Sequence, residues 1–241
     1  MIRLAALAAL LTLAATPALA QQFTVDFGED GPLSGRVIQL FLLVSVLSLV
    51  PGLAVMITCF PFVVTVLSIL RQAIGLQAAP PNMLIVSLAL FLTWFVMDPV
   101  FTAAWEAGLG PLADGTLPVE TAIPAALEPF RGFMAARVSP DTFAALAALR
   151  PDGAEIAPGP AAPLPVLVPA FMLSEIERAF EIGFLIFLPF LVIDLVVAAI
   201  LMSMGMMMVP PAVVALPFKL AFFVVADGWH LIAAALVRSY S

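Results

Sequence analysis

The amino-acid sequence predicts an all-α integral membrane protein, built of kinked helical hairpins with a small acidic helical region outside the membrane. Of the 241 residues, 63% are hydrophobic and 10% are charged, whereas soluble domains average roughly 45–50% and about 25%. The charges are unevenly placed, because 14 of the 25 lie between Glu106 and Glu181. Prolines interrupt the apolar stretches on either side, where they remove helical hydrogen-bond donors. Two apolar helical blocks therefore flank an acidic middle.

The first twenty residues have the features of a secretory signal peptide. Arg3 supplies the positive start, Leu4 to Leu13 the apolar stretch, and Ala18-Leu19-Ala20 the small-residue cleavage site. We expect residues 1–20 to be removed, which leaves residues 21–36 as a mature N-terminal segment outside the cytoplasm. The alternative is an uncleaved first anchor, but the apolar part is too short to span a bilayer of ~30 Å.

The first apolar block covers residues 37–105. Its uncharged start, Val37 to Leu70, would form a helix of roughly 51 Å, well beyond one membrane thickness. We expect this stretch to break or fold back at Pro51-Gly52 and at Cys59-Phe60-Pro61, because proline removes a helix donor and glycine loosens the chain.

A short polar turn, Arg71 to Pro81, is predicted in the middle of the same block, followed by a second apolar segment from Met83 to Trp105. Asp98-Pro99 is expected to kink or end this second segment, since the residue before a proline disfavours helical backbone angles. The block therefore predicts apolar helices joined by short breaks.

The acidic middle covers residues 106–181 and is predicted to be a small helical region that faces water. Ser139-Pro140-Asp141 has the cap, the first-turn proline and the acidic residue of a helix start. Arg150 to Pro169 holds six prolines and is expected to be an extended linker. After it, Ser174 and Glu177 fit a capping box at the start of another helix. The acidic balance fits the periplasmic side of the membrane.

The second apolar block, residues 182–241, predicts a helical hairpin with a methionine-rich loop. Its two members, Ile182 to Val209 and Ala212 to Val237, are separated by Pro210-Pro211, which cannot lie inside a regular helix. The prolines inside the two members are Pro189 and Pro217. We therefore expect kinked helices packed on protein neighbours, which can satisfy the freed carbonyl groups.

Composition argues against several classes of function. The net charge is -7, so the broad basic surface that nucleic-acid binding requires is absent. One Cys and one His cannot supply the three or four ligands of a typical zinc site. The sequence shows no nucleophile paired with a base and no glycine-rich phosphate loop. We expect a protein that is not an enzyme, with no cofactor and no nucleic-acid partner.

Five ionisable residues lie in or beside the apolar segments: Asp98, Asp194, Lys219, Asp227 and His230. A lone charge at the bilayer centre costs at least ~2.5 kcal/mol, so these residues need partners or water. They form either a proton or ion relay, or structural pairs between helices or in a subunit interface. Asp227 and His230 can touch on one helix face, whereas Lys219 is too far along the chain from Asp227 for a direct pair. Lys219 is therefore expected to meet Asp194 or a carboxylate of another subunit.

Five of the 11 methionines lie within Met202 to Met208, directly before Val209-Pro210-Pro211. Methionine is flexible and apolar, so such a cluster at a bend suits a deformable seal or an adaptable binding surface. Thioether sulfur also binds Cu(I), and an ordinary apolar helix end is a third interpretation. A small-molecule or copper transporter, with Asp194, Lys219 and Asp227 as its relay, is the alternative to a sealing role.

Eight segments carry a recognisable pattern: Pro80-Pro81-Asn82, Leu88 to Thr93, Pro169 to Glu175, Ala179 to Phe184, Pro189 to Leu195, Gly205 to Pro211, Leu216 to Leu220 and Asp227-Gly228-Trp229. Together these segments resemble the FliP family, a core membrane protein of the flagellar type III export gate that is related to SctR of injectisomes. The resemblance covers most of the chain from Thr58 onward. One departure is Cys59-Phe60-Pro61-Phe62, which stands where family members usually carry Ser-Phe and then a basic residue.

The resemblance implies a subunit that assembles in several copies with FliQ-like and FliR-like partners and other export-apparatus proteins. It implies a location in the bacterial inner membrane, in the flagellar basal body, and a pore through which unfolded secreted proteins pass. Met206, Met207 and Met208 match the methionine loop that lines and gaskets the closed pore in this family. The resemblance further implies that the hairpins need not be ordinary bilayer spans, because the assembled complex can lift them out of the lipid plane.

Overall fold

The structure, a computed structural model, describes residues 33–76, 80–151, 156–206 and 208–240. The described residues form helices and connecting loops, and no strand occurs among them, as the sequence predicts. The proposed signal peptide, residues 1–20, and the segment 21–32 lie outside the described residues. The chain divides into two compact units, residues 1–48 and 49–241.

Helix α2 (Leu33–Met56) is continuous across Pro51-Gly52, so the break predicted there is wrong. An apolar helix can keep a proline, because in apolar surroundings the helix remains the conformation that satisfies most of its backbone groups. The break predicted at Cys59-Phe60-Pro61 is confirmed, since α2 ends at Met56 and a new helix begins at Phe60. Thr58 forms this turn: its hydroxyl donates to the carbonyl of Val55 (2.8 Å) and accepts the N–H of Phe60 (3.3 Å).

Helix α3 (Phe60–Ile74) lies at the centre of the main hydrophobic core of the second unit. Pro61 occupies its first turn, where a missing N–H costs nothing, and Gly75 ends it in the left-handed conformation (φ 88°). The helix packs closely on helix α8, because a Cβ at Gly183 of that helix would lie 2.4 Å from Cδ1 of Ile69. A small residue at this contact lets the two apolar helices approach, as at many membrane helix pairs.

Helix α4 (Asn82–Ala104) follows the predicted polar turn and continues through Pro99. The expectation that Asp98-Pro99 could end the segment is therefore wrong. The helical path continues as a π-helix, η1 (Trp105–Leu109), and a short α5 (Gly110–Ala113). At η1 the backbone of helix α6 comes so close that a Cβ on Gly108 would lie 2.3 Å from the carbonyl oxygen of Ala122. This packing, which local sequence does not encode, carries the helical path beyond residue 105.

Helices α6 (Val119–Arg137) and α7 (Pro140–Ala148) lie within the acidic middle, which is largely helical as predicted. The helix start at Ser139-Pro140-Asp141 is confirmed: the Ser139 hydroxyl accepts the N–H of Thr142 (3.5 Å), and Pro140 lies in the first turn. Phe143 of α7 is buried in a second core with Phe171 of helix α8. The middle region is therefore packed onto the hairpin rather than being separate from it.

Helix α8 (Leu164–Ser203) begins earlier than expected. The linker predicted to run to Pro169 ends before Leu164, and the capping box predicted at Ser174 and Glu177 is wrong because both lie inside the helix. The Ser174 hydroxyl instead donates to the carbonyl of Ala170 (2.8 Å) and accepts the N–H of Ser139 (2.9 Å). Burial of an apolar face against α7 outweighs the proline signal. Pro165 in the first turn removes only a donor that would be unsatisfied, whereas Pro169 lies inside the helix.

Helix α8 is 40 residues long, about 60 Å at 1.5 Å per residue, or about twice the hydrocarbon thickness of a bilayer. By length and composition it can cross a membrane, as can the helical path Asn82–Ala113. A third candidate span is the bent pair formed by α9 (Pro211–Val225) and α10 (Gly228–Arg238). The described residues therefore hold two candidate spans, or three if the bent pair is one span.

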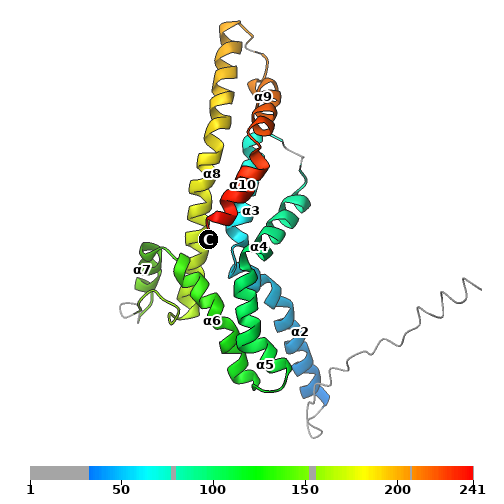
Figure 1. Cartoon of the computed structure of the whole chain (residues 1–241), viewed down its shortest axis with the longest axis vertical. Coiled ribbons are helices and arrows are strands. Elements are labelled where there is room, and N and C mark those ends of the chain that lie inside the picture. The colour runs from blue at the N-terminus through cyan, green and yellow to red at the C-terminus, as the bar shows by residue number, and fades with distance from the viewer. Residues whose placement is uncertain (1–32, 77–79, 152–155, 207, 241) are drawn as a thin grey trace, which may run out of the picture. The chain divides into compact units, whose positions relative to one another are not determined.

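The predicted C-terminal hairpin is confirmed. Helix α8 and α9 lie side by side, joined by a loop that ends at Pro210-Pro211 (Figure 1). The second member is broken at Ala226-Asp227, where its axis turns by 62°. Asp227 adopts the left-handed conformation there (φ 49°), which a non-glycine residue rarely does. The sharp bend thus lies well beyond Pro217, which stays inside α9.

Candidate pore loop and buried charge clusters

The loop between α8 and α9, residues 204–210, is called here the methionine loop. Helix α8 ends in a Schellman motif: the N–H of Met206 donates to the carbonyl of Leu201 (3.0 Å), and the N–H of Gly205 to that of Met202 (3.1 Å). Gly205 has a φ of 76°, which glycine adopts without strain. Pro210 and Pro211 then start α9 with preset backbone angles. The described backbone on either side of residue 207 is therefore set by these hydrogen bonds and by the two prolines.

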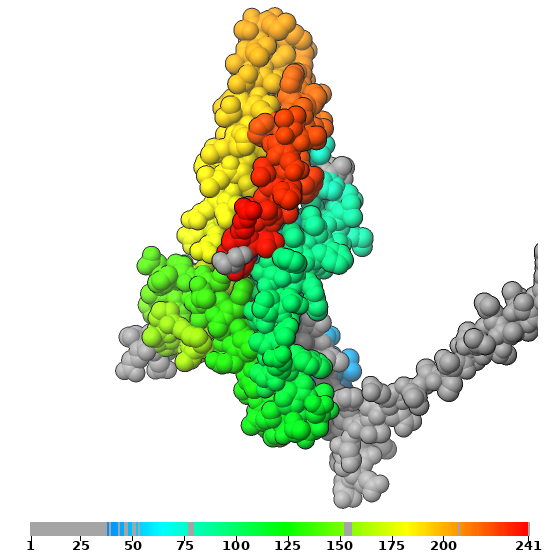
Figure 2. Space-filling view, in the orientation of Figure 1, coloured from blue at the N-terminus to red at the C-terminus, as the bar shows by residue number. Residues whose placement is uncertain are grey.

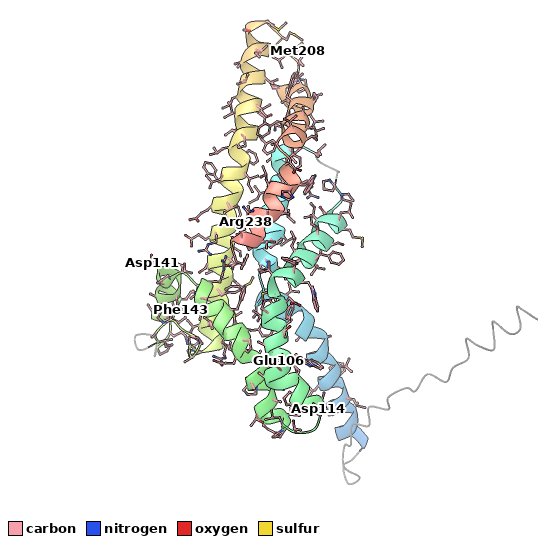
Figure 3. All side chains as sticks on the ribbon, viewed as in Figure 1. Glu106, Asp114, Asp141, Phe143, Met208 and Arg238 are labelled. Carbon is pink, nitrogen blue, oxygen red and sulfur yellow. The ribbon has the colours of Figure 1, made fainter. Side chains whose placement is uncertain are left out.

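The methionine side chains of this loop are exposed. Met208 is 97% exposed and Met206 is 41% exposed, whereas Met207 lies outside the described residues. Figure 3 shows Met208 at the end of the α8–α9 hairpin that lies farthest from the labelled α7 residues. Below the loop, Met204 and Met206 line an apolar groove of ≈ 540 Å³ between α8 and α9. Met208 is therefore almost unused in packing within the protomer, whereas Met206 is partly covered.

Lys219 and Asp194 form an ion pair between α9 and α8. The Lys219 Nζ donates to Asp194 Oδ2 (2.7 Å) and to the carbonyl oxygen of Ala73 at the end of α3 (3.0 Å). Lys219 is only 6% exposed. A cation at the C-terminal end of a helix also meets the negative end of the helix dipole. This Lys219 node, made of Lys219, Asp194 and the Ala73 carbonyl, ties three helices together.

The other ionisable residues of the apolar segments lie apart from this node. Asp98, Asp227 and His230 are exposed, and no ion pair involving them occurs in the described part of the chain. The spacing allows Asp227 and His230 to touch, but they form no ion pair in the described structure, where Asp227 lies in the bend before the first turn of α10. Asp194 keeps one buried oxygen, Oδ1, without a hydrogen-bond partner among the described residues.

A second buried cluster was not anticipated from the sequence. Arg137 at the end of α6 donates from Nε to Glu175 Oε1 (2.9 Å) and from Nη1 to the carbonyl of Ser239 (2.7 Å). The Tyr240 hydroxyl donates to Glu175 Oε2. Glu175 is fully buried. We call this set of four residues, Arg137, Glu175, Ser239 and Tyr240, the Tyr240 clasp.

Aromatic rings surround the clasp. The guanidinium carbon of Arg137 lies 3.8 Å from the centre of the Tyr240 ring, a cation–π arrangement. Tyr240 also stacks on Phe133 (6.0 Å between ring centres) and meets the edge of Phe62 (5.5 Å). Phe62 belongs to the segment that departs from the usual family pattern, so that segment contributes an apolar contact here. Residues far apart in sequence form this cluster, and no local pattern indicates it.

Burial and the neighbouring charge of Glu175 raise the pKa of the Tyr240 phenol, which lies beyond the last residue of α10. Both effects disfavour the phenolate: burial removes its hydration, and a carboxylate repels it. We therefore expect a titration of ultraviolet absorbance to show little tyrosinate at pH ~10, where an ordinary tyrosine is half ionised. Because the chain has one tyrosine, the signal reports Tyr240 alone.

The comparison for this titration is Glu175→Gln, which removes the charge but keeps a hydrogen-bond acceptor. Its tyrosine should ionise at lower pH than that of the unchanged chain. Because the folded-state pKa is raised, the stability contributed by the clasp is fully present below pH ~10 and is lost as the pH rises further. Half-ionisation at pH ~10 in the folded protein would show that Tyr240 is not held beside Glu175.

Comparison with known proteins identifies a family and several relatives that this chain resembles in sequence. The sequence pattern of the FliP family matches residues 43–236. A flagellar biosynthetic protein FliP from Caulobacter vibrioides is 50% identical over 218 residues, which is 90% of this chain and 81% of the relative. The protein of that name from Agrobacterium fabrum is 46% identical over 98% of both chains. The one from Bacillus subtilis is 43% identical over 84% of this chain and 91% of the relative.

Proposed function

Because the chain belongs to the FliP family, we propose that it is a subunit of the gated pore through which unfolded flagellar proteins are exported. It is a flagellar biosynthesis protein of the export apparatus with apolar helices suited to a membrane. Several copies would assemble with FliQ-like and FliR-like subunits in the bacterial inner membrane, within the basal body. The role is structural rather than enzymatic. Family membership favours this function over the small-molecule or copper transporter.

The observation that carries the proposal is the exposed methionine loop at the end of the hairpin. Met206, Met207 and Met208 would meet the same residues of neighbouring copies and close the lumen. Met208 is almost fully exposed in the protomer, so a second surface is needed to bury it. Flexible thioethers can close around a narrow lumen and still part for chains of variable side chains.

The charged residues have a supporting role in this proposal. Lys219 and Asp194 fix α9 against α8 and α3, which sets the position of the methionine loop. Asp227 is exposed, so its carboxylate would face water or another subunit rather than lipid. A carboxylate exposed to hydrocarbon is costly. These residues would then act in assembly rather than as a relay.

The charge distribution along α8 supports a placement of the acidic middle outside the hydrocarbon layer, on the side that we assign to the periplasm. Its N-terminal half carries the charged residues Glu177, Arg178 and Glu181, all exposed, while Ile182–Ser203 holds only Asp194. Charged positions fit outside the hydrocarbon layer and the apolar half fits within an apolar environment. Helices α6 and α7, which pack on the charged half, would then share its side of the membrane.

The test is the mass of the detergent-extracted complex, purified through a tag on this chain with FliQ-like and FliR-like proteins of the same genome co-expressed. A large hetero-oligomer with several copies of the chain is expected, because the exposed apolar surfaces need neighbours. A monomer or simple dimer despite co-expression would contradict the export-gate assignment. Omitting the two partners gives the control for non-specific association.

A further inference from the structure

The bend between α9 and α10 is concentrated at one residue. Asp227 lies in the left-handed region (φ 49°, ψ 46°) and its side chain makes no cap hydrogen bond. Residues other than glycine rarely adopt this conformation. Gly228 follows, and a Cβ there would lie 2.2 Å from Cε2 of Phe223. A single strained position, Asp227, therefore joins two helices that each have regular geometry.

Between this bend and the clasp, α10 is weakly embedded. Only Gly228 and Leu236 of the helix are buried. An apolar groove of ≈ 300 Å³ separates it from α8, and one of ≈ 410 Å³ lies between it and α4. On the face shown in Figure 2, α10 lies at the surface between α8 and α4. The helix thus has open apolar space on both sides along much of its length.

The two ends of α10 are held differently. At its C-terminal end, Ser239 and Tyr240 join the Arg137–Glu175 ion pair, which is buried. Arg238, labelled in Figure 3, marks the last turn of α10 next to this point. At its N-terminal end, α10 follows α9. Helix α9 is tied to α8 and α3 by Lys219, a contact in which the clasp residues take no part. Loss of the clasp would therefore free α10 but leave α9 in place.

We propose that α10 is a hinged strap, fastened across α8 and α4 by the Tyr240 clasp and able to swing about Ala226-Asp227 when the clasp opens. The clasp bridges positions 102 and 65 residues apart in the chain, so it closes only after α6 and α8 are in place. Fastening the strap is then the last packing step of the protomer. This inference concerns the single protomer and holds whether or not the methionine loop seals a pore.

The experiment is hydrogen–deuterium exchange of the full chain in lipid nanodiscs, read on peptides from α9 and α10. Tyr240→Phe keeps the ring contacts and removes one hydrogen bond to a charged acceptor, so exchange in Gly228–Arg238 should rise about tenfold or more. Tyr240→Ala also removes the cation–π and stacking contacts and should raise it further. Exchange in Pro211–Val225 should stay unchanged in both variants.

Leu149→Ala serves as the control, because this side chain is 81% exposed and lies outside the clasp. It should leave exchange in α10 as it is in the unchanged chain. Unchanged exchange in α10 of Tyr240→Ala would show that the clasp does not fasten the helix. An equal rise of hydrogen–deuterium exchange in α8, α9 and α10 would show general destabilisation. That result would also contradict the proposal of a hinged strap.

Discussion

Replacing Lys219 with methionine is expected to lower the free energy of unfolding by about 3 kcal/mol and to impair assembly. The substitution leaves the Asp194 carboxylate and the Ala73 carbonyl without their cation. Removing one partner of a buried ion pair costs about 3–5 kcal/mol, and the one-third exposure of Asp194 places this pair at the low end. The free energy of unfolding can be measured by denaturant titration in mixed micelles, and assembly by the mass of the extracted complex.

A double variant distinguishes loss of the Lys219–Asp194 ion pair from a general loss of stability. Lys219→Met combined with Asp194→Leu removes both charges, so it should lose less stability than Lys219→Met alone. Arg178→Met removes an exposed cation from α8 and should change stability by less than ~0.5 kcal/mol. A double variant that loses the sum of the single effects would contradict direct coupling. Normal assembly with lost export in the single variant would instead indicate a relay.

The combined replacement of Met206, Met207 and Met208 by alanine is expected to make the assembled complex leaky to ions or small solutes. Met208 is 97% exposed and Met206 is 41% exposed in the protomer, so of these two side chains mainly Met206 loses internal packing. The free energy of unfolding should therefore fall by no more than about 1 kcal/mol. Conductance across a planar bilayer that contains the purified complex measures the leak, and the mass of the complex shows that assembly is intact.

Met83→Ala is the matched control, because Met83 is an exposed methionine at the start of α4, away from the loop. It should leave both conductance and assembly unchanged. Unchanged conductance of the triple variant in a complex of normal mass would exclude the loop as the seal. A complex that fails to form would instead assign these methionines to subunit contacts.

The sequence predicted the elements that depend on local chemistry. The break at Cys59-Phe60-Pro61, the helix start at Ser139 and the turn at Pro210-Pro211 all follow from proline or cap residues at positions where a helix cannot continue or begins readily. The break predicted at Pro51-Gly52 is wrong and Asp98-Pro99 does not end its helix, and both outcomes have the same reason. Apolar surroundings favour a continuous helix even where one hydrogen-bond donor is missing.

The sequence by itself determined an apolar helical protein with an acidic middle, a methionine-rich turn and the resemblance to the FliP family. The packing of α8 on α9 decided that Met208 is exposed. The same packing made Asp194 the partner of Lys219. The Tyr240 clasp was decided by tertiary structure alone, because it joins α6, α8 and the end of the chain. Local patterns report on residues within about a helical turn, whereas a buried charge takes its partner from whichever helix the fold brings near.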